Sequence, residues 1–179
     1  MELIALSCFS IKEALLLFEL HCRSLFDFRE FCVKILDMKN ILNFLIEVGK
    51  LKKMPRTGFV WLGIKNPETI AQHSFRVAMM NWILGEKVRP KLDLEKVIKI
   101  SLVHDLCEVY AGDMTPYWGL LPKDPQKRTE ILKRWIRLPQ KIKKKRDQEK
   151  FQKEKKSLEK LVKNLELSIK KEIMDCWLE

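Results

Sequence analysis

Residues 101–113 read SLVHDLCEVYAGD, and this stretch decides the fold and the chemistry of the chain. His104 and Asp105 are adjacent in it, and Glu108 follows one helical turn later. Side chains three and four residues apart share one face of a helix, so all three groups can face one site. Burying two carboxylates without a cation would be costly, and a divalent metal removes that cost. The stretch therefore predicts a metal site on a helix.

A second histidine stands upstream, where residues 67–80 read PETIAQHSFRVAMM. Asn66 followed by Pro67 is typical of a helix start, so we predict a helix from there to about Leu84. One face of this helix is expected to point to the core, with Ile70, His73, Val77, Met80 and Leu84 on it. On its own, His73 would more often be a core histidine with a hydrogen-bond partner. Together with His104 and Asp105 it suits a divalent ion that keeps a position open for water or substrate.

The rest of the chain also predicts helices. Residues 10–36 are expected to form one or two helices, and 39–52 an amphipathic one, whereas 59–64 read as an extended segment or loop. Asp93 can cap a helix that continues through Glu108 to a stop at Gly112. Residues 128–138 form an amphipathic piece that Pro139 ends. Residues 141–171 are lysine-rich, with an apolar stripe at Leu158, Leu161, Val162, Leu165 and Ile169. The predicted fold class is all-α.

Composition narrows the class of protein. A chain of 179 residues is expected to form one domain. The five cysteines have no CxxC spacing, which indicates free thiols in a reducing cytoplasm. No stretch is long and apolar enough for a membrane span, and the start lacks the features of a signal peptide.

The net charge is +11, with most of the excess after residue 120. A basic surface can attract nucleic acid or phosphate, but a solvated lysine face is the simpler interpretation. Aromatic residues are not interleaved with these lysines, so a nucleic-acid partner is not expected.

From Met38 onward the chain resembles the HD-domain metal phosphohydrolases, and most closely their branch of 5′-deoxynucleotidases. Three segments carry the resemblance, in the family's order: GKLKKMPRTGFVW, NPETIAQHSFRVAMM and LVHDLCEVYAGDMTP. Counted from Met38 to the end of the third segment, the resemblance covers about 80 residues. The resemblance implies an HD-domain helical bundle over residues 38–179, whereas residues 1–37 have no counterpart and are expected to be an added helical segment or an upstream extension.

The resemblance also implies roles for single residues. His73, His104 and Asp105 match metal ligands for one divalent ion (Mn, Co, Mg, Zn or Fe). Glu108 matches the catalytic acid or base. Asp113 matches the carboxylate that contacts the sugar and helps to reject ribose, and is counted with the catalytic residues. Arg56 matches the arginine that meets the phosphate. Read without the resemblance, Arg56 could be a surface charge and Glu108 a partner that orients His104.

One feature of the family's pattern is missing. Its fourth ligand is an aspartate on a late helix, past a segment that IMDCWLE resembles, and this sequence ends at Glu179, before that helix. Asp175 is the nearest aspartate, but it lies within the preceding motif, so it receives no role. Gln72 receives none either.

The predicted function is hydrolysis of the 5′-phosphate of deoxynucleoside monophosphates by a cytoplasmic enzyme. The resemblance implies that this enzyme is a homodimer. Two alternatives stay open. One is an HD-type phosphohydrolase that acts on a cyclic or signalling nucleotide. The other is a non-enzymatic binder of nucleotides or nucleic acid on the same scaffold.

Overall fold

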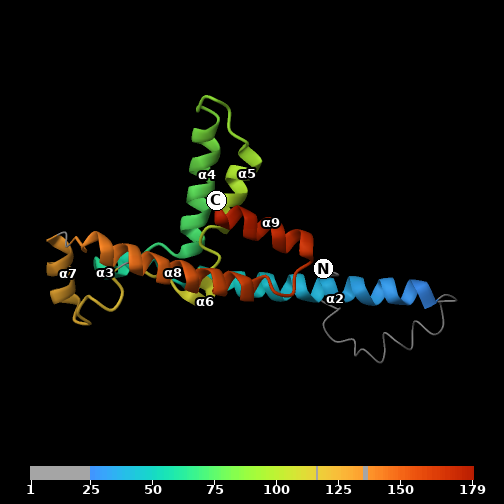
Figure 1. Ribbon diagram of the computed structural model, residues 1–179, viewed down its shortest axis with the longest axis horizontal. Helices are drawn as coiled ribbons and strands as arrows, with labels where there is room; N and C mark the ends of the chain where they lie inside the picture. Colours follow the sequence, from blue (N-terminus) through green and yellow to red (C-terminus); the bar gives the residue numbers. More distant parts are fainter. Residues whose placement is uncertain (1–24, 116, 135–136) are drawn as a thin grey trace. The chain divides into compact units, whose positions relative to one another are not determined.

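The computed structural model describes residues 25–115, 117–134 and 137–179, and its regular elements are helices joined by loops (Figure 1). The helices are α2 (Leu25–Val48), η2 (Gly49–Lys53), α3 (Thr57–Trp61), α4 (Ile70–Gly85), α5 (Leu94–Val103), α6 (Glu108–Ala111), α7 (Pro125–Lys133), α8 (Gln140–Leu161) and α9 (Leu167–Leu178). These residues contain no strand, although an isolated bridge joins Pro55 to Thr69. The predicted all-α class is confirmed. A search of the described helices for one that could cross a membrane finds none.

The chain divides into two compact units, Met1–Asn40 and Ile41–Glu179. Of the first unit, the structure describes only residues 25–40, which belong to α2. The predicted helix break before residue 39 is wrong, because α2 runs on to Val48 and is followed by the 3-10 helix η2. The rest of the predicted helix over residues 10–36 lies outside the described residues. The boundary between 37 and 38 stays a prediction.

The core of the second unit is built from η2, α4, the segment after α5, α8 and α9. Its most deeply buried side chains include Leu51, Ile70, Cys107, Leu158 and Val162. The predicted stripe is buried at Leu158, Leu161, Val162 and Leu165, and only Ile169 departs from it, being 36% exposed. Burial of each such aliphatic side chain stabilises the fold by about 1.5–3 kcal/mol. This stripe therefore stabilises the packing of α8 against the helices that carry the site.

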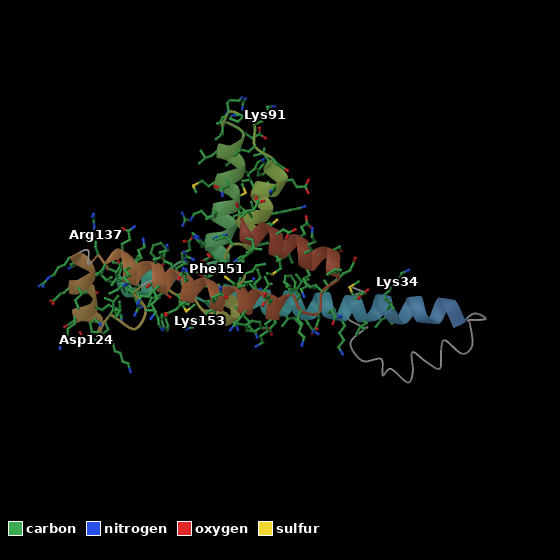
Figure 2. All side chains as sticks on the ribbon, viewed as in Figure 1. Lys34, Lys91, Asp124, Arg137, Phe151 and Lys153 are labelled. Carbon is green, nitrogen blue, oxygen red and sulfur yellow. The ribbon has the colours of Figure 1, made fainter. Side chains whose placement is uncertain are left out.

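Aromatic stacking adds to the contact between α8 and α9. The rings of Phe151 and Trp177 stack with centroids 5.3 Å apart. Figure 2 labels Phe151 and the nearby Lys153 on α8. The lysine-rich stretch over residues 141–171 is divided between two helices, α8 and α9, because the chain turns after Leu161 and packs back through this pair.

Helix α4 begins later than predicted. Thr69, not Asn66, is its N-cap, and the Thr69 hydroxyl accepts from the Gln72 amide while the Gln72 side chain accepts from the Thr69 amide. This reciprocal capping box satisfies two free backbone donors at once. Gln72, which received no role, therefore has a structural one.

The outer half of α4 also differs from the prediction. Ile70 is fully buried, but Met80 and Leu84 are 48% and 55% exposed. Helical spacing places them on one face, as predicted, yet about half of the surface of each stays exposed at the end of that face. Figure 1 shows α4 and α5 side by side as an antiparallel pair.

The helix that carries His104 is interrupted. Asp93 caps α5 through the Lys96 amide, as predicted, but α5 ends at Val103 and α6 begins only at Glu108. Between them the backbone bonds tighten to three-residue spacing, as from the Glu108 amide to the Asp105 carbonyl at 3.0 Å. The predicted continuous helix to Gly112 is thus wrong. Gly112 does end α6, with φ of 75°.

Two further boundaries are corrected. Residues 57–61 form the short helix α3, so the extended segment or loop predicted over 59–64 is wrong for residues 59–61, whereas residues 62–64 do form a turn and loop. Helix α7 is capped by Asp124, begins at Pro125 and ends at Lys133 rather than at residue 138. Residues 135 and 136 of that predicted piece lie outside the described residues.

Candidate metal and active site

Two histidines and an aspartate meet where α4 passes the end of α5. His104 Nε2 lies 3.1 Å from Asp105 Oδ2, and His73 Nε2 lies 3.8 Å from the same oxygen. One ligand atom from each of the three residues falls within 4.8 Å of the others, and no second group of this kind occurs in the described part of the chain. The structure therefore brings together the three residues that the sequence predicted as ligands.

The His104 ring is oriented by the backbone. Its Nδ1 lies 2.8 Å from the Ser101 carbonyl oxygen, which can only accept a hydrogen bond. The Nδ1 atom therefore carries a proton, and in the neutral ring the lone pair is at Nε2, facing Asp105. Such an orienting bond on the far nitrogen is usual for metal-binding histidines.

Charge in the site moves the pKa values of these groups. The hydrogen bond to Asp105 raises the pKa of His104. Burial, followed by the nearby Arg56 charge, lowers the pKa of His73. Burial of Asp105 works to raise its pKa, but the bond to His104 and the surrounding positive charges lower it overall. Asp105 is therefore ionised near neutral pH and available as a ligand.

Arg56 enters the site from the loop before α3. Its backbone amide donates to the Glu68 carbonyl at 2.8 Å, which fixes the loop against the start of α4. Its guanidinium bonds to Asp105 Oδ2 at 2.7 Å and lies 3.8 Å from Glu108 Oε2 and 3.7 Å from Asp113 Oδ2. Among the described residues, Arg56 is thus a cation that lies close to all three site carboxylates, and it is not a free surface charge.

Glu108 is the most deeply buried acid of the site, with 2% of its surface exposed. Its Oε2 has no hydrogen-bond partner among the described residues. Burial, followed by the charges of Asp105 and Asp113, raises the pKa of Glu108 to about 8. A buried, unsatisfied carboxyl group beside an arginine and two further carboxylates fits a site built for a cation and a proton transfer.

Asp113 is tied to the Arg56 loop. Its Oδ2 accepts from the Thr57 amide at 2.7 Å, and the Thr57 hydroxyl donates to the Asp113 carbonyl at the same distance. These two bonds close the loop after Gly112 onto the start of α3. Because only 11% of its side chain is exposed, Asp113 is held at the rim of the site with limited freedom.

Comparison with known proteins adds to this geometry. A family model described as an HD domain matches residues 48–179, a range that includes every site residue named above. The chain belongs to the HD-domain family. An HD domain implies that a divalent metal is bound, and the cluster of His73, His104 and Asp105 has the donors that such an ion takes.

Curated relatives of this HD-domain chain include 5′-deoxynucleotidase HDDC2 of Dictyostelium discoideum and 5′-deoxynucleotidase HDDC2 of Xenopus laevis. The first is 35% identical over 79% of this chain and 64% of its own length. The second is 30% identical over 79% of this chain and 56% of its own length. A conserved hypothetical protein from Pyrococcus furiosus aligns structurally over 77% of this chain and 99% of its own, with 24% identity and a TM-score of 0.42. The chain thus spans about three fifths of the length of these two curated relatives.

Two carboxylates near the HD-domain site were missed by sequence reasoning. Glu68 lies 3.6 Å from His73 Nδ1 through its Oε2, and the bond to Arg76 lowers its pKa. Glu154 on α8 is 14% exposed, and burial raises its pKa, with the charges of Asp105 and Asp113 adding to the shift. Glu68 could have been noticed beside His73 in PETIAQH. Glu154 could not, because nothing local separates it from the other charges of a lysine-rich helix.

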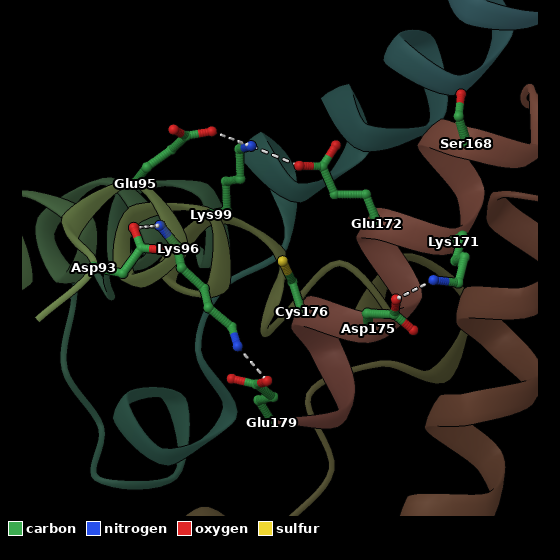
Figure 3. A pocket seen from close by; sticks show the side chains of 10 residues that line it. All are labelled: Asp93, Glu95, Lys96, Lys99, Ser168, Lys171, Glu172, Asp175, Cys176 and Glu179. Atoms are coloured by element: carbon green, nitrogen blue, oxygen red, sulfur yellow. Dashed lines mark hydrogen bonds and ion pairs between the residues drawn. The ribbon is translucent and has the colours of Figure 1, made fainter.

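Asp175 lies in a different place from the metal cluster. Figure 3 shows it in a surface hollow between α5 and α9, where it faces Lys171 at 3.4 Å. Its side chain is 60% exposed. Of the other charges drawn in that hollow, Lys96 is paired with Glu179, and Lys99 with Glu95 and Glu172, whereas Asp93 accepts from the Lys96 backbone amide. In this geometry Asp175 lies outside the cluster of predicted metal ligands, as expected from the sequence.

The described free thiols lie in the core. Cys107 and Cys176 are buried and unpaired. Burial raises the pKa of Cys107 to about 12, so this thiol stays protonated although it is next to the site. Both behave as small apolar residues, in agreement with the prediction for these two positions.

Proposed function

We propose that this chain is the metal-binding core of a 5′-deoxynucleotidase, which removes the 5′-phosphate from deoxynucleoside monophosphates. One observation carries the proposal. His73, His104 and Asp105 converge beside Arg56 and the buried Glu108 within an HD domain. The names of the curated relatives supply the substrate class. The chain covers only part of the length of these relatives, so the activity of the whole protein is itself proposed here.

One divalent ion would be held by the Nε2 atoms of His73 and His104 and by the Asp105 carboxylate. When bound, such an ion lowers the pKa of water and polarises a phosphoryl oxygen. Its identity is open among Mn, Co, Mg, Zn and Fe. A fourth protein ligand, which the family resemblance implies, is not part of the cluster among the described residues.

Arg56 is proposed to bind the phosphate. Its planar guanidinium offers several donors in the geometry that a phosphate accepts. In the structure one of these donors is held by Asp105, and the side chain is 26% exposed. An incoming phosphate would therefore compete with the site carboxylates for Arg56, and would find it already aimed at the cluster.

Glu108 is proposed to move the proton. In hydrolysis a water oxygen forms the new bond to phosphorus, the bond from phosphorus to the 5′-oxygen breaks, and the leaving oxygen gains a proton. With a pKa of about 8, Glu108 holds a proton at neutral pH and can donate it to the 5′-oxygen. The proton lost by the attacking water then restores Glu108.

Asp113 is proposed to contact the sugar. It is fixed by Thr57 at the rim of the site, on the loop that follows α6. A carboxylate held in one position can distinguish a sugar carbon that carries a hydroxyl from one that does not, because a misplaced or unpaired polar group costs binding free energy. This supports a preference for deoxyribose over ribose.

The remaining partners and the location are proposals too. A homodimer is supported by apolar side chains that α4 leaves exposed, such as Phe75 at 68% and Ile83 at 58%. We expect no nucleic-acid partner, since α8 carries a single aromatic ring, Phe151, and this ring stacks on Trp177 instead of forming one of a series of free stacking platforms. We expect no membrane partner either. The buried free thiols support a reducing cytoplasm.

The test is phosphate release from a matched panel of deoxy- and ribonucleoside monophosphates, with each candidate metal added to metal-free protein. Release that is faster from deoxynucleotides and absent without metal supports the proposal. Equal release from both sugars, or release only from cyclic or signalling nucleotides, would point to another HD-type phosphohydrolase. Nucleotide binding without any release would point to a binder.

A further inference from the structure

We infer that Glu68, clamped by Arg76, is the positioning residue that orients His73 for metal binding. The inference rests on the proposed metal site. Glu68 stands just before the N-cap of α4, at the edge of the cluster rather than in it. Its carboxylate connects a ligand histidine to an exposed arginine one turn further along the same helix.

The first observation is the clamp itself. Arg76 Nε donates to Glu68 Oε1, and Arg76 Nη2 donates to Glu68 Oε2, both at 2.8 Å. Two parallel bonds of this kind fix the plane of the carboxylate as well as its position. The Glu68 side chain is 17% exposed, whereas Arg76 is 61% exposed. The arginine therefore does not itself serve the site, but it holds a largely buried carboxylate in one orientation.

The second observation is the direction of the His73 ring. Its Nδ1 faces Glu68 Oε2 at 3.6 Å, while its Nε2 faces Asp105 Oδ2 at 3.8 Å. The Glu68 distance is slightly too long for a hydrogen bond, but such bonds are often long before a ligand arrives and tighten when it binds. A carboxylate is an acceptor only, so it favours the ring form in which Nδ1 carries the proton. That form leaves the lone pair at Nε2, toward the cluster.

The third observation is the parallel with His104. There the Ser101 carbonyl plays the same part, at 2.8 Å from Nδ1, and Nε2 again faces Asp105. Both ligand rings thus have an acceptor behind them and the shared carboxylate oxygen in front. The two acceptors differ in kind. The Ser101 carbonyl behind His104 is fixed by the helix backbone, whereas the Glu68 carboxylate behind His73 is a side chain that must itself be held in place.

The backbone of Glu68 has a separate duty. Its carbonyl accepts from the Arg56 amide at 2.8 Å, and this bond sets the loop that delivers Arg56. A change confined to the carboxylate leaves the carbonyl in place. Glu68→Gln is therefore the informative variant, since it keeps size and backbone but replaces one carboxylate oxygen with a donor.

The experiment measures Mn²⁺ binding by calorimetry to the metal-free 179-residue chain and to three variants. Glu68→Gln is expected to weaken Mn²⁺ binding about 10–100-fold, the usual cost of losing a group that orients a ligand. Arg76→Ala, at an exposed helix position, is expected to give a smaller loss in the same direction. Glu95→Gln is the matched control, because it removes an exposed carboxylate paired with Lys99 and should change nothing.

A second readout does not depend on metal or substrate. Long-range ¹H–¹⁵N NMR of histidine-labelled, metal-free protein reports which ring nitrogen of His73 is protonated. We expect the Nδ1–H form in the parent and a shift toward Nε2–H in Glu68→Gln. If the parent binds Mn²⁺ and Glu68→Gln changes neither the ring form of His73 nor the Mn²⁺ affinity, the inference about Glu68 is overturned while the proposed metal site stands. A parent that binds no divalent ion would overturn the proposed metal site, and the ring form would still decide the role of Glu68.

If Glu68→Gln does not fold, as judged by circular dichroism, Arg76→Ala carries the test. Loss of the clamp should raise the population of the Nε2–H form of His73 and weaken Mn²⁺ binding. Parent-like values for both in folded Arg76→Ala would contradict the clamp.

Discussion

Arg56 and Asp105 are joined by a hydrogen bond of 2.7 Å from Nη1 to Oδ2, the same oxygen that faces both histidine rings. One carboxylate atom is thus shared between the arginine proposed for phosphate and the histidines proposed for metal. A cation that binds Asp105 must weaken this bond, and the freed guanidinium is then available for a phosphate. Metal and phosphate binding are therefore expected to be coupled through Asp105.

Removing the Arg56 charge should separate these two functions. In Arg56→Gln the competing positive charge is gone, so we expect Mn²⁺ to bind at least as tightly as in the parent. Phosphate release should fall by about 10–100-fold, the cost of one hydrogen bond to a charged group. Calorimetry and a phosphate-release assay on the same preparation measure both effects. Weaker Mn²⁺ binding with unchanged hydrolysis would contradict the assignment.

His104→Ala should abolish binding of a divalent ion. Because a bound ion stabilises only the folded protein, the parent should gain about 2.7 kcal/mol when metal is present at 100 times its Kd, and the variant should gain nothing. Thermal unfolding with and without metal measures this. Leu167→Ala, at a 78% exposed position of α9, is the control and should keep the metal-dependent gain.

The stability of the metal-free protein should depend on pH through Glu108. Its pKa is raised to about 8 in the folded state from an ordinary value of 4.5, so the folded protein holds this proton more tightly than the unfolded chain does. The stabilisation that this gives is complete below about pH 4.5 and is lost as the pH rises toward 8. Glu108→Gln should remove this loss, which we place on the order of 1–3 kcal/mol.

Urea unfolding of parent and Glu108→Gln at pH 5.5 and pH 8 measures the effect. The parent should lose more stability between the two pH values than the variant does. If both lose the same amount, the pKa of Glu108 is not raised in the folded protein.

Asp113 is expected to govern sugar choice. Asp113→Ala should slow the hydrolysis of deoxynucleotides and weaken any preference for them over ribonucleotides, since the variant lacks the carboxylate proposed to face the sugar. It also loses the bond from the Thr57 amide. Asp113→Asn keeps an oxygen that can accept this bond, so it should fold like the parent but still discriminate poorly. Ratios of kcat/KM for matched deoxy- and ribonucleotides decide between these outcomes.

The core stripe of α8 gives a test of the fold. Leu158 is fully buried, so Leu158→Ala should lower the free energy of unfolding by about 2–5 kcal/mol. Leu167, on α9, is 78% exposed, and Leu167→Ala should change it by no more than about 0.5 kcal/mol. Chemical denaturation of the two variants measures the contrast. Similar losses would mean that α8 does not pack as described.

Local sequence alone predicted much of the site and of the fold. The adjacency of His104 and Asp105, the spacing to Glu108, and the stops and caps at Gly112 and Asp93 depend on interactions within about four residues. So does the apolar stripe of α8. These features could be predicted because helix geometry ties sequence spacing to direction in space, and the predicted ligands did converge even though the helix between Val103 and Glu108 is broken.

Tertiary packing decided the rest. The bond from Arg56 to Asp105 spans 49 positions, and the burial of Glu154 depends on how α8 packs against the site. The later start of α4 at Ile70 follows from a capping box and from the Ile70 amide bonding to the Met54 carbonyl, which no count of helix formers reveals. Periodicity likewise placed Met80 and Leu84 on a buried face, but burial needs a partner surface. Only the packed chain determines which carboxylates share one cation and which apolar faces are covered.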